Sequence, residues 1–419
     1  MRHCWGVKFV SPRGPPSRSG GPLSRLHALL VHKLRPCLSP RLPTTLSTGQ
    51  VRPSARFTVR RVVSVFIIVV NGAELSVRRL IRLQAFCTST LETRSPSSTM
   101  AAIGNRGTVT EAPGFDPEAD AQRLRGAMKG TGTDEAAVID VLAHRTVAQR
   151  QRIKEAFKQA VGKDLADELS SELSGNFQTV VLGLLMLAPV YDAYELRTAM
   201  KGAGTEEACL VDILASRTNP EIKTITSFFK KEYGKDLEDA VCGDTSGMFQ
   251  RVLVSLLTAG RDEGDKVDEA QAAKDAKEIF EAGEARWGTD EVKFLTVLCV
   301  RNRNHLMRVF EEYQKISGRD IEDSIKREMS GCLEDVFLAI VKCMRSRPAF
   351  FAEKLYKSMK GLGTTDSVLI RIMVARAEID MLDIKAQFLK MYGKTLLSFI
   401  KGDTSGDYRK ILMELCGGE

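Results

Sequence analysis

Four short glycine-rich segments are the residues most suited to chemistry in this sequence. They are Met128–Thr133, Met200–Thr205, Glu284–Thr289 and Met359–Thr364. Glycines that adopt positive φ can turn several carbonyl oxygens of a loop toward one point. Calcium prefers six to eight oxygen ligands, so these segments are suited to hold part of a hard-cation site.

An acidic residue follows each glycine segment at a fixed distance. It lies forty residues after the last glycine of the segment, and Ser-Gly begins two residues further on. The four acids are Glu172, Asp244, Glu328 and Asp403. One carboxylate that binds the ion through both oxygens would supply the negative charge that the loop carbonyls lack. The pairing of loop and acid therefore predicts calcium as the cofactor.

The predicted calcium ligands are three main-chain carbonyls and one carboxylate in each copy. They are Met128, Gly130, Gly132 and Glu172 in the first copy, Met200, Gly202, Gly204 and Asp244 in the second, and Met359, Gly361, Gly363 and Asp403 in the fourth. Such a set leaves coordination positions free for phosphate oxygens of a lipid. We therefore predict that calcium bridges the protein to anionic phospholipid membranes.

The third copy departs from this pattern because Arg286 stands where a glycine is expected. Its predicted ligands are Gly283, Arg286, Gly288 and Glu328. Trp287 and Leu362 hold the variable position of their loops, and tryptophan is favoured at membrane interfaces. We predict that both contact the membrane, although a buried structural role fits Trp287 equally well.

Two other functions fit these residues less well than membrane binding does. A phosphate cradle for nucleotides is disfavoured because the loops lack the Lys-Ser/Thr of a P-loop and follow helices rather than strands. A helical-repeat scaffold that binds proteins, with structural calcium, is the main alternative. Such a scaffold has no need for an acid at one offset in every copy, and this favours membrane binding. If the glycines were only helix C-caps and the acids only N-caps, the pairing would have no function.

Helices on both sides of each glycine segment must position these residues. Val138, Val141 and Leu142 have the i, i+3, i+4 spacing of one helix face, and every copy repeats it. The preceding helix carries one equivalent apolar residue in each copy, namely Leu124, Leu196, Phe280 and Leu355. Each copy is therefore predicted to be an all-helical bundle. The threonine that ends each glycine segment, such as Thr133, is predicted to be the N-cap of the next helix.

Two further marks recur in all four copies. An arginine lies thirteen residues after the last loop glycine, and a glycine lies thirty residues after it. The arginines, which we expect to tie helix ends together, are Arg145, Arg217, Arg301 and Arg376. The predicted repeats span residues 115–186, 187–258, 271–342 and 346–417, with a short segment at 100–114 and a linker at 259–270.

The first 99 residues differ in composition from the rest. They hold nine of the 14 prolines and 16 Lys and Arg against two acids. Such a segment cannot easily bury a core, and we expect it to be disordered. Met100 directly precedes the globular pattern and is interpreted as the start of the main product, although a targeting role for the extension is the alternative.

The remaining residues carry 45 Lys and Arg against 51 Asp and Glu. This acidic body argues against binding of nucleic acid, and an anionic membrane should repel it unless a cation intervenes. The nine cysteines show no zinc spacing or disulfide framework. The mostly apolar segment Val62–Val70 has nine residues, with Ser64 among them, which is too short to span a bilayer. His144 and His305 lie in no catalytic spacing, and no enzyme is predicted.

Lys-Gly-x-Gly-Thr with an acid 39 residues after the threonine, four times repeated, resembles the annexin family over about residues 107–419. The segments Val292–Cys299, Arg301–Leu306 and Ile379–Asp383 strengthen the resemblance. It implies a curved disc of four homologous five-helix repeats that docks on phosphatidylserine-rich membranes. It also implies roles in vesicle aggregation and exocytosis, self-association on the membrane, and a location on the inner face of the plasma membrane and vesicles, with the nucleus as a further site. The extension has no counterpart in the family pattern.

Overall fold

The computed structural model describes residues 106–130, 132–202, 204–285 and 288–418, all of which belong to one compact unit. The regular secondary structure of this part of the chain consists of helices, without strands. The predicted all-helical fold is therefore confirmed. The extension predicted for residues 1–99 lies outside the described residues, as does Met100.

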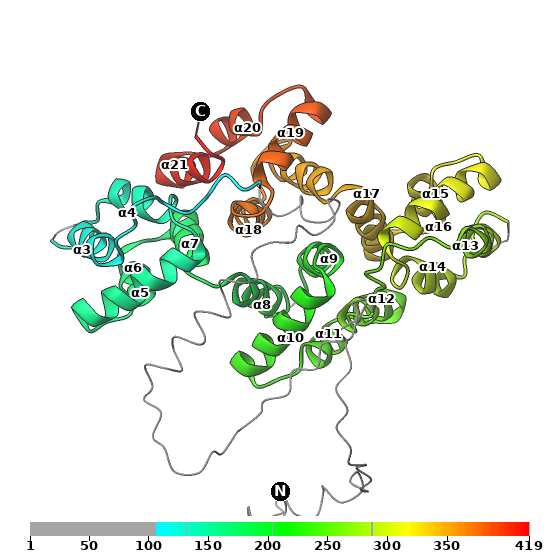
Figure 1. Ribbon diagram of the computed structural model, residues 1–419, viewed down its shortest axis with the longest axis horizontal. Helices are drawn as coiled ribbons and strands as arrows, with labels where there is room; N and C mark the ends of the chain where they lie inside the picture. Colours follow the sequence, from blue (N-terminus) through cyan, green and yellow to red (C-terminus); the bar gives the residue numbers. More distant parts are fainter. Residues whose placement is uncertain (1–105, 131, 203, 286–287, 419) are drawn as a thin grey trace, which may run out of the picture. The chain divides into compact units, whose positions relative to one another are not determined.

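The first two repeats contain five helices each (Figure 1). Repeat 1 comprises α3 (Pro117–Ala127), α4 (Glu135–Leu142), α5 (Val147–Val161), α6 (Leu165–Glu172) and α7 (Gly175–Leu184). Repeat 2 comprises α8 (Ala188–Ala199), α9 (Glu207–Ser216), α10 (Asn219–Tyr233), α11 (Leu237–Asp244) and α12 (Gly247–Leu257).

Repeats 3 and 4 share the long element α17 (Gly331–Met359). Its backbone is broken at Ser346, whose φ of −160° and ψ of 104° are not helical. The Ser346 hydroxyl accepts a bond from the Ala349 amide, so it caps a new helix. Repeat 3 also holds α13 (Glu269–Ala282), α14 (Glu291–Leu298), α15 (Arg303–Ser317) and α16 (Ile321–Glu328), and repeat 4 holds α18 (Asp366–Arg376), α19 (Met381–Tyr392), α20 (Leu396–Asp403) and α21 (Gly406–Leu415).

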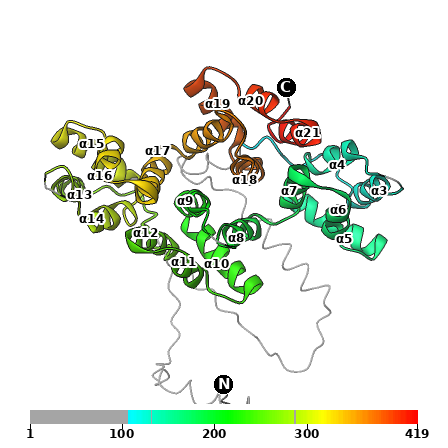
Figure 2. The same ribbon diagram turned by 180° about the vertical axis from the view of Figure 1, so that it is seen from behind.

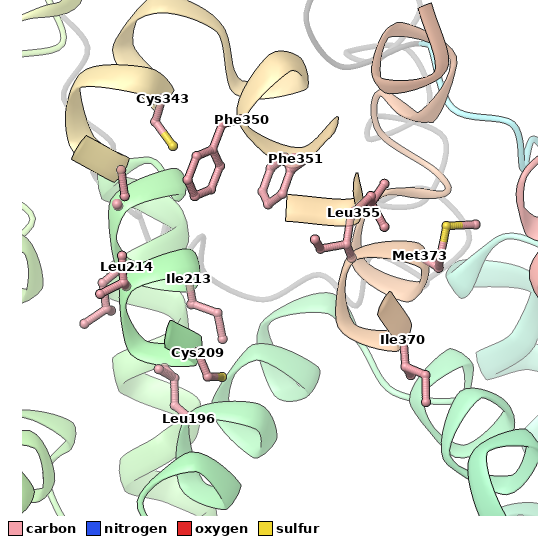
Figure 3. Packing of buried hydrophobic residues seen from close by; sticks show 14 of the residues in the cluster. Leu196, Cys209, Ile213, Leu214, Cys343, Phe350, Phe351, Leu355, Ile370 and Met373 are labelled. Atoms are coloured by element: carbon pink, nitrogen blue, oxygen red, sulfur yellow. The ribbon is translucent and has the colours of Figure 1, made fainter. Parts of the chain in front are cut away.

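The core includes most of the residues that the helical period selects, but Phe280 of α13 is only partly buried and the fully buried Ile279 takes its place. Leu124, Val138 and Val141 are fully buried, as are Leu196 and Leu355 in the equivalent helices of other repeats. The core continues between repeats, because α17 packs against both α9 and α18. Figure 3 shows side chains from these helices, together with Leu196 of α8. Repeat 4 also packs on repeat 1, through α21 against α4 and α7 (Figure 2).

The prediction that the loop threonines are N-caps is wrong. The cap of the following helix is the next residue in each repeat, namely Asp134, Glu206, Asp290 and Thr365. The side chain of Asp134 accepts a bond from the Ala137 amide, as a cap does. The threonine hydroxyls are therefore available for another contact.

The repeated arginines tie helices together, as expected. In repeats 1 to 3 the guanidinium donates two bonds to one aspartate of the first helix, in the pairs Arg145–Asp120, Arg217–Asp192 and Arg301–Asp275. Burial raises the pKa of the Asp275 carboxyl, but bonds from Arg301, Gln271 and His305 outweigh it and leave the pKa lowered.

Repeat 4 binds its repeated arginine in a different way. Phe351 takes the position that aspartate holds in the other three repeats, and the Arg376 guanidinium lies 4.8 Å from the centre of its ring. Arg376 donates instead to both oxygens of Asp380, at 2.8 and 2.7 Å. Both partners are almost fully buried, so the pair is shielded from water.

Candidate calcium sites

The four predicted carboxylates occupy one structural position. Each is the last residue of the fourth helix of its repeat, namely Glu172 of α6, Asp244 of α11, Glu328 of α16 and Asp403 of α20. The interpretation of these acids as N-caps is therefore wrong. A helix C-terminus carries partial negative charge, so an acid there is unfavourable by itself. A bound cation would be attracted by both the carboxylate and the helix end.

Each carboxylate accepts a hydrogen bond from the threonine that ends its glycine loop. The distances from threonine Oγ1 to the carboxylate oxygen are 3.2 Å for Thr133–Glu172, 3.0 Å for Thr205–Asp244, 3.1 Å for Thr289–Glu328 and 3.1 Å for Thr364–Asp403. The fold thus brings together loop and acid that are 39 residues apart in the chain. One carboxylate oxygen is fixed, and the acid faces its own loop.

Backbone bonds close the glycine loops of repeats 1, 2 and 4 in the same way. The amide of the residue after the threonine donates to the carbonyl seven residues earlier, from Asp134 to Ala127 at 2.9 Å, from Glu206 to Ala199 at 2.9 Å and from Thr365 to Ser358 at 2.8 Å. Gly130 and Gly132 have φ of 118° and 86°, and the glycines of the other two loops are similar. Side chains rarely adopt these angles, which explains the loop composition.

The loop of repeat 3 is one residue longer. Its closing bond runs eight residues back, from the Asp290 amide to the Ala282 carbonyl at 2.7 Å. Gly283 therefore follows the last helical residue directly, as Met128 and Met200 do in their repeats. A Cβ at Gly283 would lie 3.4 Å from Cγ of Glu328, so this position faces the site carboxylate. The predicted ligand Arg286 and the predicted membrane contact Trp287 lie outside the described residues.

Of the two predicted membrane contacts, Leu362 lies within the described residues. Its side chain is 108% exposed, more than any other exposed large apolar side chain in the described part of the chain. It lies between Gly361 and Gly363, whose φ values are 116° and 86°. A leucine without apolar neighbours is exposed at the cost of its hydrophobic transfer energy, so a second apolar phase would stabilise it.

The donor set fits calcium rather than a soft metal. Within the described residues no three His, Cys, Asp or Glu side chains gather at one point. Each site therefore offers carboxylate and main-chain oxygens, which are ligands for a hard cation. The assignment of particular residues as calcium ligands stays a prediction. The structure describes the contact between each threonine and its carboxylate.

The threonine hydroxyls are functional candidates that the sequence analysis missed. Their type suggested a helix cap, and a cap explained them without reference to the ion. The signal was the constant position of threonine directly after the last glycine in all four copies. A cap in only some copies, or a mixture of Ser, Asp and Asn, would have been expected if capping alone were required.

Helical repeats that each join a glycine loop to a distant carboxylate define a repeat protein with loop sites for a hard cation. The annexin family model matches four segments of the chain, 119–184, 191–256, 274–340 and 350–415. The chain belongs to the annexin family, whose members in general bind phospholipid in a calcium-dependent way.

Particular relatives agree with this assignment. The chain is 63% identical to annexin A4 of Mus musculus over 313 residues, which cover 75% of this chain and 98% of that protein. It matches the structure of chicken annexin V in complex with Zn2+ at 54% identity and a TM-score of 0.73, over 75% of this chain and all of that one. The calcium-bound annexin (Sm)1 matches at 35% identity and a TM-score of 0.66, over 75% and 93%.

Helices long and apolar enough to cross a membrane are absent from the described ranges.

Proposed function

We propose that this protein binds anionic phospholipid membranes through calcium ions held in its glycine loops. The observation that carries the proposal is the threonine-bound carboxylate at a helix C-terminus beside each loop, repeated four times. A structural role does not explain this position, because the helix end disfavours an acid. The same observation disfavours a scaffold in which calcium is only structural.

The loop carbonyls, the carboxylate, the threonine and Leu362 would each have a different role in this function. The loop carbonyls and the carboxylate would bind the ion, and the threonine would orient the carboxylate toward it. Bound calcium supplies positive charge that attracts lipid phosphate. Leu362, fully exposed in its loop, would enter the interfacial layer of the membrane.

Net charge makes the ion a requirement. The residues from Met100 onward carry an excess of acids, and an anionic leaflet repels such a body. Four weak sites that engage one surface together would bind much more tightly than any one alone. Binding should therefore rise steeply with calcium and disappear when calcium is chelated.

Sedimentation with phosphatidylserine vesicles, with and without calcium, tests the proposal on the chain from Met100, which lacks the basic extension. A double variant, Asp244→Asn with Asp403→Asn, should need roughly ten- to a hundredfold more calcium, since each lost site weakens the avidity. A double variant with the same change of charge nearby, Asp239→Asn with Asp407→Asn, should bind as the unchanged protein does. Binding of the unchanged protein without calcium would contradict the proposal.

The family resemblance extends the proposal to the process that the binding serves. We propose that docking on the inner face of the plasma membrane and on vesicles promotes membrane aggregation and exocytosis, with self-association on the membrane surface. Light scattering of mixed vesicles tests aggregation directly. A protein that sediments with vesicles in calcium but leaves their scattering unchanged would restrict the function to docking.

A further inference from the structure

A cavity of about 480 Å³ lies where repeats 1, 2 and 4 meet. Its walls come from α5, α7, α8, α10 and α18, and α18 packs against both α7 and α8 (Figure 1). Pockets that bind small molecules usually measure about 300–1,000 Å³. This cavity is therefore large enough for an organic ligand.

The cavity is separate from the calcium loops. α9 begins after the loop of repeat 2, and Arg217, which lines the cavity, directly follows its last residue. α18 begins after the loop of repeat 4, and Val374 and Ala375 near its end also line the cavity. These helices of 10 and 11 residues place the loops and the cavity about 15 Å apart, because a helix rises about 1.5 Å per residue. A ligand in the cavity would therefore leave the calcium sites free.

Apolar groups cover most of the cavity wall. They include the side chains of Met186, Pro189, Ile225 and Val374, which come from three different repeats. Hydrocarbon that enters such a cavity is removed from water, and this favours binding. The wall therefore suits a ligand with an apolar body.

One charged group of the wall, the guanidinium of Arg150, lacks a full set of partners. Its side chain is 2% exposed, and its Nη1 donates to the Glu378 carboxylate at 3.0 Å and to the Leu184 carbonyl at 3.3 Å. Its Nε donates to the Leu142 carbonyl at 2.8 Å, but its Nη2 has no hydrogen-bond partner among the described residues. Burial lowers the pKa of Arg150 to about 10, although the charge of Glu378 opposes this shift. A second acceptor beside Arg150 would satisfy Nη2 and stabilise the buried charge.

The acids of the wall already have donors. Both oxygens of Asp192 accept from Arg217. Both oxygens of Glu378 accept from the Val147 amide, at 2.9 and 3.0 Å. One oxygen of Glu221 accepts from the amide and the hydroxyl of the residue that caps α10. The partner that the wall lacks is therefore an acceptor and not a cation.

We propose that this cavity binds an amphipathic carboxylate, with the carboxylate beside Arg150 and the apolar body against Ile225 and Val374. The carboxylate gives the buried guanidinium a second negative partner, and charge-assisted hydrogen bonds of this kind are the stronger ones. The ligand enters past Pro220 and Thr224, which are exposed members of the wall. Binding needs neither calcium nor a membrane, so the inference does not depend on the proposed function.

Isothermal titration calorimetry in EGTA tests the proposal on the chain from Met100, which contains the whole of the described compact unit. The probes are decanoate, decanol and decyltrimethylammonium, which share one hydrocarbon chain and differ in the charge of the head group. We expect decanoate to bind at least about tenfold more tightly than the other two, because only its head group adds a charged acceptor beside Arg150. Equal affinity for decanoate and decanol would overturn the assignment of Arg150, and no detectable binding of decanoate would overturn the site.

Two substitutions of threonine by tryptophan locate the ligand. Thr224→Trp places a large side chain at the cavity without removing a buried group, and should weaken decanoate binding by at least about tenfold because less apolar wall is left to cover the ligand. The matched control is Thr198→Trp, at an exposed position on α8 outside the cavity wall, which should bind decanoate as the unchanged protein does. Unchanged binding in Thr224→Trp would show that decanoate binds elsewhere and would overturn the proposal.

Arg150→Lys tests the head-group contact separately. It keeps the positive charge but loses the planar fork of nitrogens, so decanoate should bind about fivefold more weakly while decanol binding stays the same. An equal loss for both probes would mean that the substitution has disturbed the cavity, and the contact with the carboxylate would then be wrong. If this variant does not fold, the comparison of probes and Thr224→Trp still decide. Calcium-dependent sedimentation of Thr224→Trp with vesicles should match that of the unchanged protein, which keeps a failure of this site apart from a failure of the proposed function.

Discussion

Repeats 3 and 4 share the order of their helices and the threonine-carboxylate contact, but they differ at the loop and at the repeated arginine. The loop of repeat 4 exposes Leu362 fully, whereas that of repeat 3 is one residue longer. Arg376 is buried with Asp380, whereas the side chain of Arg301 is 35% exposed. Sequence divergence has therefore changed the surroundings of the shared site and left its central contact unchanged.

The largest expected difference between the two repeats concerns stability. Asp380→Ala leaves the Arg376 charge buried without its partner, and this should cost about 3–5 kcal/mol of the free energy of unfolding. Asp275→Ala should cost about 1–3 kcal/mol, because the half-exposed Arg301 can reach water. Urea unfolding followed by circular dichroism measures both.

The control for this comparison removes the charge together with its partner. Arg376→Met combined with Asp380→Leu should be less destabilising than Asp380→Ala, because no unpaired buried charge remains. If Asp380→Ala costs no more than Asp275→Ala, burial is not what distinguishes the two arginine pairs.

The second difference is the contribution of each site to membrane binding. Asp403→Asn should raise the calcium concentration for half-maximal vesicle binding by about tenfold, since it removes the only acid of an open loop. Glu328→Gln should raise it by only about twofold, because Arg286 stands in that loop where the others have a glycine that can turn its carbonyl toward the ion. Sedimentation over a calcium series compares them, and equal shifts would show that the two sites fill alike.

A smaller effect on vesicle binding is expected from substitution of Leu362 in repeat 4. Leu362→Ala should weaken vesicle binding at saturating calcium by about fivefold, because less apolar surface enters the membrane. Leu389→Ala is the control, since Leu389 is 49% exposed but lies on α19 rather than in a calcium loop. A loss of the same size in both variants would mean that general surface hydrophobicity, and not insertion of the loop, is being measured.

Much of the fold could be predicted from the sequence, because repetition makes each weak signal visible four times. The helix period selected Leu124 and Val138, and both are buried. The fixed offset predicted that Glu172 would meet its loop, and Thr133 contacts it there. These predictions depend only on the spacing of residues, which can be read from the sequence.

What could not be predicted depends on geometry finer than spacing. Thr133 is a good N-cap residue by type, and only the backbone shows that Asp134 takes that place. Eight residues before the last loop glycine lies an apolar residue in every repeat, but in repeat 3 that residue, Phe280, is only partly buried. Only the closing bond to the Ala282 carbonyl shows that the loop is one residue longer, which places the fully buried Ile279 at the position of Leu124.

The smallest predicted effect tests the threonine contact that both repeats retain. Thr364→Val keeps the shape of the side chain but removes the hydroxyl that donates to Asp403, so the carboxylate loses its fixed orientation. The calcium requirement for vesicle binding should rise by about two- to threefold, and Thr364→Ser should restore it. Thr289→Val should have a weaker effect, because Arg286 replaces a loop glycine in repeat 3 and that site should contribute less to binding. Failure of serine to rescue Thr364→Val would assign the loss to packing, and the hydroxyl would then have no part in positioning the carboxylate.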